Sequence, residues 1–478
     1  MSSLTDRLRG IIAAVPANEG APSRLRQGSG EAGRSEAEAA GPPDSSFRDD
    51  AAEVLGGSWH HAGGRQLLVI DRTYRPGHRH GHLTLVDHVL GDECEWRHVL
   101  LGPLSPSNDD SNRSRTLFID LETSGLAGGA GTSAFLVGCA WFDGCVLRVR
   151  QLFMASPTAE RVLLDALVEL ASSARLLVSY NGKSFDLPLI ETRFLFNRME
   201  PPFAGVPHLD MLHAARRLWR PIDAADGDTS AEGAEAGAPR RSAEGAEPGP
   251  PRRSAEGAEA GCSLGVLERS ICGHDREGDV AGFEIPARYF HYVRTGDARP
   301  LAAVVEHNRL DLLSLAFLTA RAARLVHEGP VAVRTAREAV GLGRLYERAG
   351  IVAKARACFA RACGLDGSSA LPGDKSTLAD ALRAYAQVCR RERSHADAAT
   401  AWRRLIALGE CPPHVYREAI EALAIHHEHR LREPRVARDF ALSSLPLQGT
   451  AARQLAIRHR LARLDRKVER DAQNAWLF

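Results

Sequence analysis

LFIDLETSGLAGG, residues 117–129, is the most informative stretch of the chain for its fold. An apolar run ends in Asp120-Leu121-Glu122. Residues i and i+2 of a β-strand project from the same face, so Asp120 and Glu122 leave the end of a buried strand together. Two adjacent carboxylates repel each other unless a cation lies between them, and Mg²⁺ prefers oxygen ligands of this kind. The pair therefore predicts a metal site.

The residues around this pair predict a mixed sheet that is covered by helices. Three strand-like stretches come in succession, and Asp143-Gly144 marks a tight turn between the second and the third. The chain then continues as helix, strand, helix and strand–helix at residues 158–172, 175–182, 186–199 and 208–219. Strands that are followed by alternating helices and strands are typical of an α/β sheet with helices on its faces.

Two further acidic motifs lie downstream of the strand. In YNGKSFD a buried strand ends at Tyr180 and Asp186 opens the next helix, where the helix dipole keeps a carboxylate ionised. In EHNRLD, His307 and Asp311 lie four residues apart and share one helix face, so the histidine could take a proton from an attacking water. Taken alone, each motif is better explained by ordinary structure, as an N-terminal helix residue for Asp186 and as a capped or solvated helical stretch for His307 and Asp311.

Together and in this order, the three motifs resemble those of the DEDD-type 3′–5′ exonuclease superfamily, whose fold is RNase H-like. Their amino-acid sequences are most similar to those of the YprB-like, ribonuclease H-like proteins of bacteria. The resemblance covers residues 113–325. It implies an α/β RNase H-like domain that hydrolyses phosphodiester bonds with two divalent cations, Mg²⁺ or Mn²⁺. The positions that match the metal ligands of the superfamily are Asp120, Glu122, Asp186 and Asp311.

The last motif departs from the superfamily in one respect. Members carry either Tyr-x3-Asp or His-x4-Asp, whereas His307 stands at the tyrosine spacing from Asp311. The resemblance still implies His307 as the general base. Candidate substrate-binding residues are Thr123 and Ser124, through their backbone N–H groups, together with Tyr180 and Asn181.

One more carboxylate, Asp210 in HLDML, lies at another strand end. It either supports the metal shell or caps the following helix, and the cap is the interpretation that we favour.

Composition limits the class of protein. The chain has 478 residues, 44% of them hydrophobic and 25% charged, which fits a soluble protein of two or three domains. Its sequence offers no apolar run of the roughly 18 residues that a membrane span needs, and residues 1–20 do not read as a signal peptide. The nine cysteines are scattered without a CxxC, which indicates free thiols and a cytoplasmic location.

Three segments outside the central domain are expected to differ from it. Residues 1–60 are rich in small and charged residues and are expected to be disordered, as is a low-complexity insertion at residues 222–261 that repeats SAEGAE three times. Residues 61–112 are expected to form a β-rich extension and linker. Within them, His78-Arg79-His80-Gly81-His82 could bind a metal, although a solvated hairpin loop is the interpretation that we favour.

From residue 330 to residue 478 the pattern is helical throughout. Three helix pairs can be aligned, and the second helix of each carries one large aromatic side chain, at Phe359, Trp402 and Phe440. This resembles a degenerate tetratricopeptide-type repeat, with an irregular helical bundle as the alternative. The region holds 26 Lys and Arg residues against 16 Asp and Glu residues, in a chain whose net charge is +1. A basic surface of this kind fits a polyanion, although a simple preference for arginine explains the count equally well.

The sequence therefore predicts a metal-dependent nuclease, most simply a 3′–5′ exonuclease on DNA or RNA. Its partners are expected to be nucleic acid, through a single strand or a 3′ end, and a protein bound by the helical repeats. The first alternative is a non-catalytic nucleic-acid-binding or scaffold protein that acts through those repeats. The second is an endonuclease that uses the same two-ion chemistry.

Overall fold

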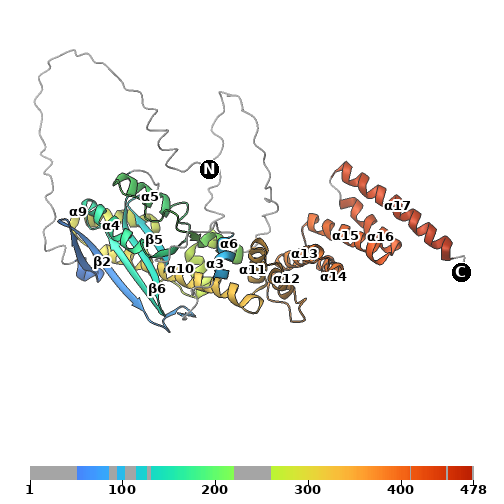
Figure 1. Ribbon diagram of the computed structural model, residues 1–478, viewed down its shortest axis with the longest axis horizontal. Helices are drawn as coiled ribbons and strands as arrows, with labels where there is room; N and C mark the ends of the chain where they lie inside the picture. The colour runs from blue at the N-terminus through green and yellow to red at the C-terminus, as the bar shows by residue number, and fades with distance from the viewer. Residues whose placement is uncertain are drawn as a thin grey trace, which may run out of the picture. The chain divides into compact units, whose positions relative to one another are not determined.

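A seven-stranded sheet, in the order β1-β2-β7-β6-β5-β8-β9, forms the centre of the fold (Figure 1). The computed structural model describes residues 51–85, 94–102, 115–125, 131–219, 260–409, 411–447 and 450–475. The strands of the sheet are β1 (Ser58–Ala62), β2 (Arg65–Tyr74), β5 (Arg115–Thr123), β6 (Ala134–Asp143), β7 (Val146–Phe153), β8 (Ala174–Ser179) and β9 (His208–Asp210). A separate hairpin consists of β3 (Arg79–His80) and β4 (Leu83–Thr84).

The mixed sheet confirms the expected fold class. Strands β5, β6 and β7 pair antiparallel in succession, and Asp120 lies opposite Gly138 in the β5–β6 register. Strand β8 runs parallel to β5, and β9 runs parallel to β8. Strand β5 is thus paired on both sides up to Phe118, whereas the Asp120-Leu121-Glu122 segment extends beyond the end of the β8 pairing and pairs with β6.

Helices cover the sheet and then continue beyond it. Those that accompany the sheet are α3 (Cys94–Leu101), α4 (Glu160–Ala171), α5 (Asp186–Phe196), α6 (Met211–Leu218), α8 (Leu264–Leu267), the π-helical turn η3 (Glu268–Cys272), α9 (Ile285–Thr295) and α10 (Ala302–Glu328). The later helices are α11 (Ala336–Arg348), α12 (Val352–Cys363), α13 (Lys375–Arg391), α14 (His395–Ala407), α15 (Pro413–His426), α16 (Pro434–Ser444) and α17 (Ala451–Ala475).

Alternation along β5 sends its side chains to two different hydrophobic cores. Phe118 packs in the core that contains Leu312 of α10, whereas Ile119 packs in the core that contains Leu163 of α4. Because the period of a strand is two residues, Asp120 and Glu122 share the face of Phe118. The two carboxylates therefore emerge on the side of the sheet that α10 covers.

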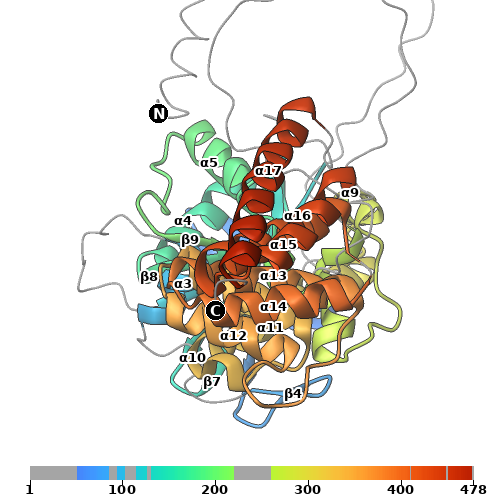
Figure 2. The same cartoon turned by 90° about the vertical axis from the view of Figure 1, so that its right-hand side faces the viewer.

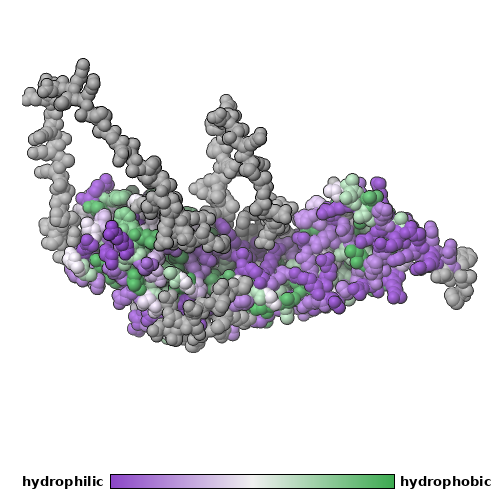
Figure 3. All heavy atoms as spheres, turned by 45° about the horizontal axis from the view of Figure 1, so that its top comes forward, coloured by the Kyte–Doolittle hydropathy of each residue, from purple (hydrophilic) through white to green (hydrophobic). Residues whose placement is uncertain are grey.

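The helical region contains the three expected helix pairs, α11 with α12, α13 with α14 and α15 with α16. Helices α15, α16 and α17 lie side by side in both views of the ribbon (Figures 1 and 2). Phe359 and Trp402 are buried at matching places in α12 and α14, and Phe440 packs between α16 and its neighbours. On the face drawn in Figure 3, the surface over these last helices is mostly hydrophilic.

Buried Glu338 of α11 joins this helical region to the sheet domain. Its carboxylate accepts hydrogen bonds from Arg321 of α10, at 2.9 and 3.0 Å, and from the indole of Trp219 at 3.1 Å. All three side chains are less than a tenth exposed. A buried ion pair of this kind is costly to break, so α10 and α11 are firmly connected.

Several expectations outside the sheet need adjustment. The segment expected to be disordered at residues 1–60 includes β1 at its end, and Leu55 is buried in the core, because these residues complete the sheet edge. The rest of that segment, residues 1–50, and nearly all of the 222–261 insertion lie outside the described residues. The hairpin expected at residues 78–82 is present, but His80 is buried rather than solvated. Among the described helices, none is long and apolar enough to cross a membrane.

Candidate active site

The four carboxylates of the three motifs act on one another's ionisation. Burial raises the pKa of Asp120 well above its ordinary value, and the charges of Asp311, Glu122 and Asp186 raise it further. Burial likewise raises the pKa of Glu122, followed by the charges of Asp311 and Asp186. Three segments that are distant in sequence, β5, the start of α5 and the middle of α10, therefore bring their carboxylates into one electrostatic cluster. We call Asp120, Glu122, Asp186 and Asp311 the carboxylate cluster.

Asn308 of α10 fixes the orientation of Asp120. Its side-chain amide donates to Asp120 Oδ2 at 2.8 Å and to the Asp120 carbonyl at 3.2 Å, and its own oxygen accepts from buried Gln151 at 2.8 Å. Gly138, opposite Asp120 in the sheet, makes room for this contact, because a Cβ there would lie 2.2 Å from Asn308 Oδ1. A glycine in the middle of a strand here reflects the close approach of a helical side chain.

Asp311 is held by a cation on one oxygen and faces a histidine on the other. Arg276 donates to Asp311 Oδ1 at 2.5 Å, and it also donates to Glu268 at 2.5 Å. His307 Nε2 lies 3.4 Å from Asp311 Oδ2, while its Nδ1 lies 2.7 Å from Asp279 Oδ1. The imidazole is thus placed between two carboxylates, and its orientation is fixed from the Nδ1 side.

Asp186 enters the cluster as the first residue of α5 and carries an elevated pKa. Burial, followed by the charges of Asp210 and Asp311, raises it to about 7. Asp210 caps α6, in line with the interpretation that we favour, by accepting from Leu212 N at 3.1 Å. The same carboxylate accepts from the backbone of Asn181 at 2.8 Å, so it also holds the loop that leads to Asp186.

The expected substrate-binding residues are mostly engaged within the fold. The N–H of Ser124 donates to the carbonyl of Ser133 at 2.9 Å, and contact of Ser124 with a nucleotide stays a prediction. Thr123 Oγ1 donates to the carbonyl of Gly125. The hydroxyl of Tyr180 donates to the carbonyl of Cys262, which ties β8 to the chain that resumes after the insertion. Asn181 has a left-handed backbone, with φ of 62°, and shapes the loop.

Sequence reasoning missed Asn308, Arg276 and Asp279 as parts of this site. Asn308 lies within the third motif, and a polar residue on the apolar face of a helix could have indicated a buried partner. Arg276 and Asp279 follow η3 in a stretch without periodicity, so nothing local to them predicts their contacts with Asp311 and His307.

The donor chemistry of the carboxylate cluster fits a hard divalent cation. Carboxylate oxygens are the ligands that Mg²⁺ and Mn²⁺ prefer. Burial and, after it, the negative charges of neighbouring carboxylates raise the pKa of Asp120, Glu122 and Asp186, while Arg276 forms an ion pair with Asp311. A bound cation would offset that repulsion.

Comparison with known proteins supports an RNase H-like fold for this part of the chain. A family model described as the RNase_H superfamily matches residues 117–225 and 252–323, which include all four carboxylates. The matched residues are therefore similar to the RNase_H superfamily. The match ends within α10, so α11 to α17 lie outside it.

The chain is also similar to the uncharacterized protein YprB of Bacillus subtilis (strain 168). The two are 28% identical over 253 residues, which is 52% of this chain and 51% of that protein. The matched part therefore spans about half the length of each. The superfamily assignment of the RNase H-like domain is thus confirmed, and the exonuclease subtype remains a prediction.

Proposed function

We propose that this protein is a divalent-metal-dependent nuclease that removes nucleotides from a 3′ end of DNA or RNA. The observation that carries the proposal is the carboxylate cluster itself, which gathers carboxylates from β5, α5 and α10 at a place where burial and neighbouring charges raise the pKa of Asp120, Glu122 and Asp186. An inactive fold has no reason to gather repelling carboxylates where burial makes each of them costly. The RNase H-like domain, a fold class associated with nucleic-acid hydrolysis, supports the same conclusion.

The residues of the cluster have separate tasks in this proposal. Asp120, Glu122, Asp186 and Asp311 hold the cations, and Asn308 keeps the carboxylate of Asp120 in place. When bound, two divalent cations would neutralise the cluster and polarise the scissile phosphate and its attacking water. His307 accepts the proton of that water at Nε2, while Asp279 accepts from Nδ1 and keeps the ring in the required tautomer.

The test is a nuclease assay on single-stranded DNA and RNA with Mg²⁺, Mn²⁺ or a chelator. Each substrate is prepared with a free and with a blocked 3′ end. We expect metal-dependent release of mononucleotides from free ends only, and loss of that activity in the variants Asp120→Asn, Asp186→Asn and Asp311→Asn. Equal degradation by the wild type and these variants would show that the site is misassigned. Cleavage of blocked or circular substrates would instead identify an endonuclease.

A matched control is Asp71→Asn, because Asp71 is an exposed carboxylate of the same sheet that pairs with Arg150 at 2.7 Å. It should retain wild-type activity. His307→Ala tests the general base separately. We expect it to slow turnover about 10²- to 10⁴-fold while metal-dependent stabilisation of the fold persists.

The helical region supports a nucleic-acid partner through its charge. A cavity of about 400 Å³ lies among α13, α15 and α17, and arginines at its wall include Arg383, Arg417, Arg453 and Arg460. Phosphate contacts made by such side chains are salt-dependent. Replacing Arg453 and Arg460 by glutamate should weaken binding of single-stranded nucleic acid and flatten its salt dependence. Unchanged binding would favour a protein partner for this region.

A further inference from the structure

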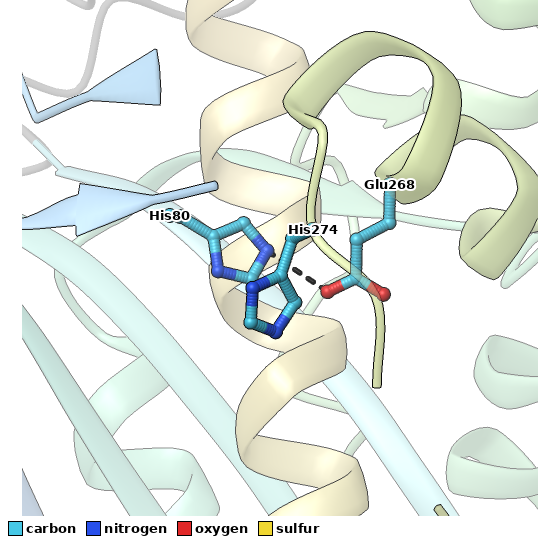
Figure 4. Close-up of side chains that lie close together, drawn as sticks. All are labelled: His80, Glu268 and His274. Atoms are coloured by element: carbon cyan, nitrogen blue, oxygen red, sulfur yellow. Dashed lines mark ion pairs between the residues drawn. The ribbon is translucent and has the colours of Figure 1, made fainter. Parts of the chain in front are cut away.

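A second polar cluster lies beside the candidate active site and draws its side chains from two distant segments. His80 ends β3, Glu268 begins η3, and His274 follows η3 (Figure 4). One potential ligand atom from each residue lies within 4.8 Å of the other two, which makes this the group of metal-ligating side chains that the described residues bring together most closely. We call these three residues the His–Glu cluster.

Two glycines hold the backbones of these segments in close contact. A Cβ on Gly81 would lie 2.1 Å from the carbonyl oxygen of Cys272, and the N–H of His82 donates to that oxygen at 2.7 Å. Gly81 and Gly273 both have left-handed backbones, with φ of 62° and 68°. Only glycine adopts that conformation without strain in such tight contact. The positions of His80 and His274 are therefore fixed by the backbone and do not depend on flexible loops.

The polar atoms of the cluster meet at one buried point. His80 Nε2 lies 2.9 Å from Glu268 Oε1, and Ser314 Oγ of α10 lies 2.9 Å from the former and 2.6 Å from the latter. His80 is 3% exposed and Glu268 is 1% exposed. The His274 ring lies beside the His80 ring at a centroid distance of 4.4 Å and is tilted by 31° from it, and Phe317 provides an apolar wall 5.5 Å from His80.

The other carboxylate oxygen of Glu268, Oε2, is held by a residue that lies outside the His–Glu cluster. Arg276 donates to Oε2 at 2.5 Å, which leaves Oε1 directed at His80 and Ser314. Metal ligands in proteins are commonly oriented in this way by partners that do not touch the metal. Two imidazoles and one carboxylate, with a hydroxyl or a water as the fourth donor, form a set that Zn²⁺ accepts in tetrahedral geometry.

We propose that the His–Glu cluster binds one Zn²⁺ ion, separate from the cations of the carboxylate cluster. Imidazole nitrogen favours zinc over Mg²⁺, which prefers oxygen donors alone, so the two sites would select different metals. Zinc at this point joins the β3–β4 hairpin to η3, and Arg276 connects the same site to Asp311.

The test measures metal content and affinity in the full-length chain. The chain is produced in zinc-supplemented medium, and its metals are counted by elemental analysis. We expect about one zinc per chain in the wild type and in Asp120→Asn, and a loss of affinity of at least about tenfold in His80→Ala and in His274→Ala. Stripped protein titrated with Zn²⁺ against a chromophoric chelator gives the affinities, and added zinc should raise the melting temperature of the wild type but not of His274→Ala.

Three controls keep the result interpretable. His78→Ala alters a neighbouring histidine of the hairpin that is outside the cluster, and it should keep its zinc. All measurements use a Cys145→Ser background, because that thiol is exposed and could bind zinc adventitiously. His274 is partly exposed, so His274→Ala remains informative even where His80→Ala does not fold. A wild type without stoichiometric zinc, or a His274→Ala variant that binds zinc as tightly as the wild type, overturns the proposal and leaves the cluster as a hydrogen-bonded contact.

Discussion

Arg276 joins the carboxylate cluster to the neighbouring His–Glu cluster, yet the pKa values of the buried carboxylates are shifted in opposite directions in the two clusters. In the carboxylate cluster, burial and mutual repulsion raise the pKa of Asp120, Glu122 and Asp186. In the His–Glu cluster, burial also raises the pKa of Glu268, but hydrogen bonds from His80, Ser314 and Arg276 outweigh burial and lower it. Burial and repulsion therefore oppose ionisation in the first cluster, whereas hydrogen bonds favour the ionised carboxylate of Glu268 and orient it in the second.

This difference would allow one domain to keep the two proposed metal sites distinct. Ligands that are neutralised only by an added ion suit exchangeable cations that take part in a reaction. Ligands that are already satisfied by hydrogen bonds suit an ion that holds segments together. Substitutions in the two clusters should therefore have different consequences for activity, stability and metal content.

Substitutions in the two clusters should differ most in their effect on nuclease turnover. Glu122→Gln removes one charge from the carboxylate cluster while keeping its shape, and we expect nuclease turnover to fall on the order of 10³-fold. His274→Ala should change turnover by less than about tenfold, since that residue lies outside the proposed catalytic set. Steady-state assays of both variants with the same labelled substrate check this. Comparable losses in the two variants would mean that the clusters act as one site.

Stability should depend strongly on the link between the clusters. Arg276→Met leaves Glu268 and Asp311 without their shared cation, and we expect the free energy of unfolding to fall by about 3–5 kcal/mol. The matched control is Arg269→Met, whose pair with Asp275 is exposed and should contribute about 1 kcal/mol or less. Denaturant unfolding of both variants gives the comparison, and equal stabilities would contradict it.

Gly138→Ala should disturb the carboxylate cluster and leave the His–Glu cluster intact. The new methyl group would press on Asn308, whose amide holds Asp120, and we expect a loss of about 1–3 kcal/mol together with reduced turnover. Zinc content should not change. Gly265→Ala is the control, because a Cβ at that helical position meets nothing within 4 Å. A Gly138→Ala variant with wild-type turnover would remove Asn308 from the proposed site.

The smallest expected effect is in the pH dependence of stability. Burial, Asp210 and Asp311 raise the pKa of Asp186 from 3.8 to about 7. In that interval the folded chain binds more protons than the unfolded chain, so its stability falls as the pH rises from about 4 to about 7. With a chelator present, the melting temperature should decrease by on the order of a few degrees over this range. Asp186→Asn should flatten the curve, and an unchanged slope would show that Asp186 ionises freely.

Much of the fold follows from residue period and spacing within single elements. The strand period places Asp120 and Glu122 on one face, and the succession of three strands and then alternating elements predicts the mixed sheet that β5 to β9 form. The helix pairs after residue 330 follow from their apolar spacing in the same way. These features are local, because a helix or strand repeats its pattern within a dozen residues.

The partners of the site residues could not be predicted by such rules. His80 meets Glu268 across 188 positions, and Arg276 reaches Asp311 from a stretch without periodicity. The same limit explains the wrong expectation at His80. A solvated loop is expected there because its partner Glu268 is remote in the sequence, and the partner of the Ser124 N–H, Ser133, is likewise not indicated by any local pattern.

Residue types and their spacing were sufficient to establish the α/β fold class, the order of the three acidic motifs and the four carboxylates that they contain. The chain encodes these features locally, within single strands and helices. Tertiary packing was required to show that Arg276 joins Asp311 to Glu268, that Asn308 positions Asp120 and that His80 is buried beside His274. Those contacts form when the sheet, the hairpin and α10 pack together. Each polar group that becomes buried then needs a hydrogen-bonding partner, and no local sequence pattern shows which residue that partner is.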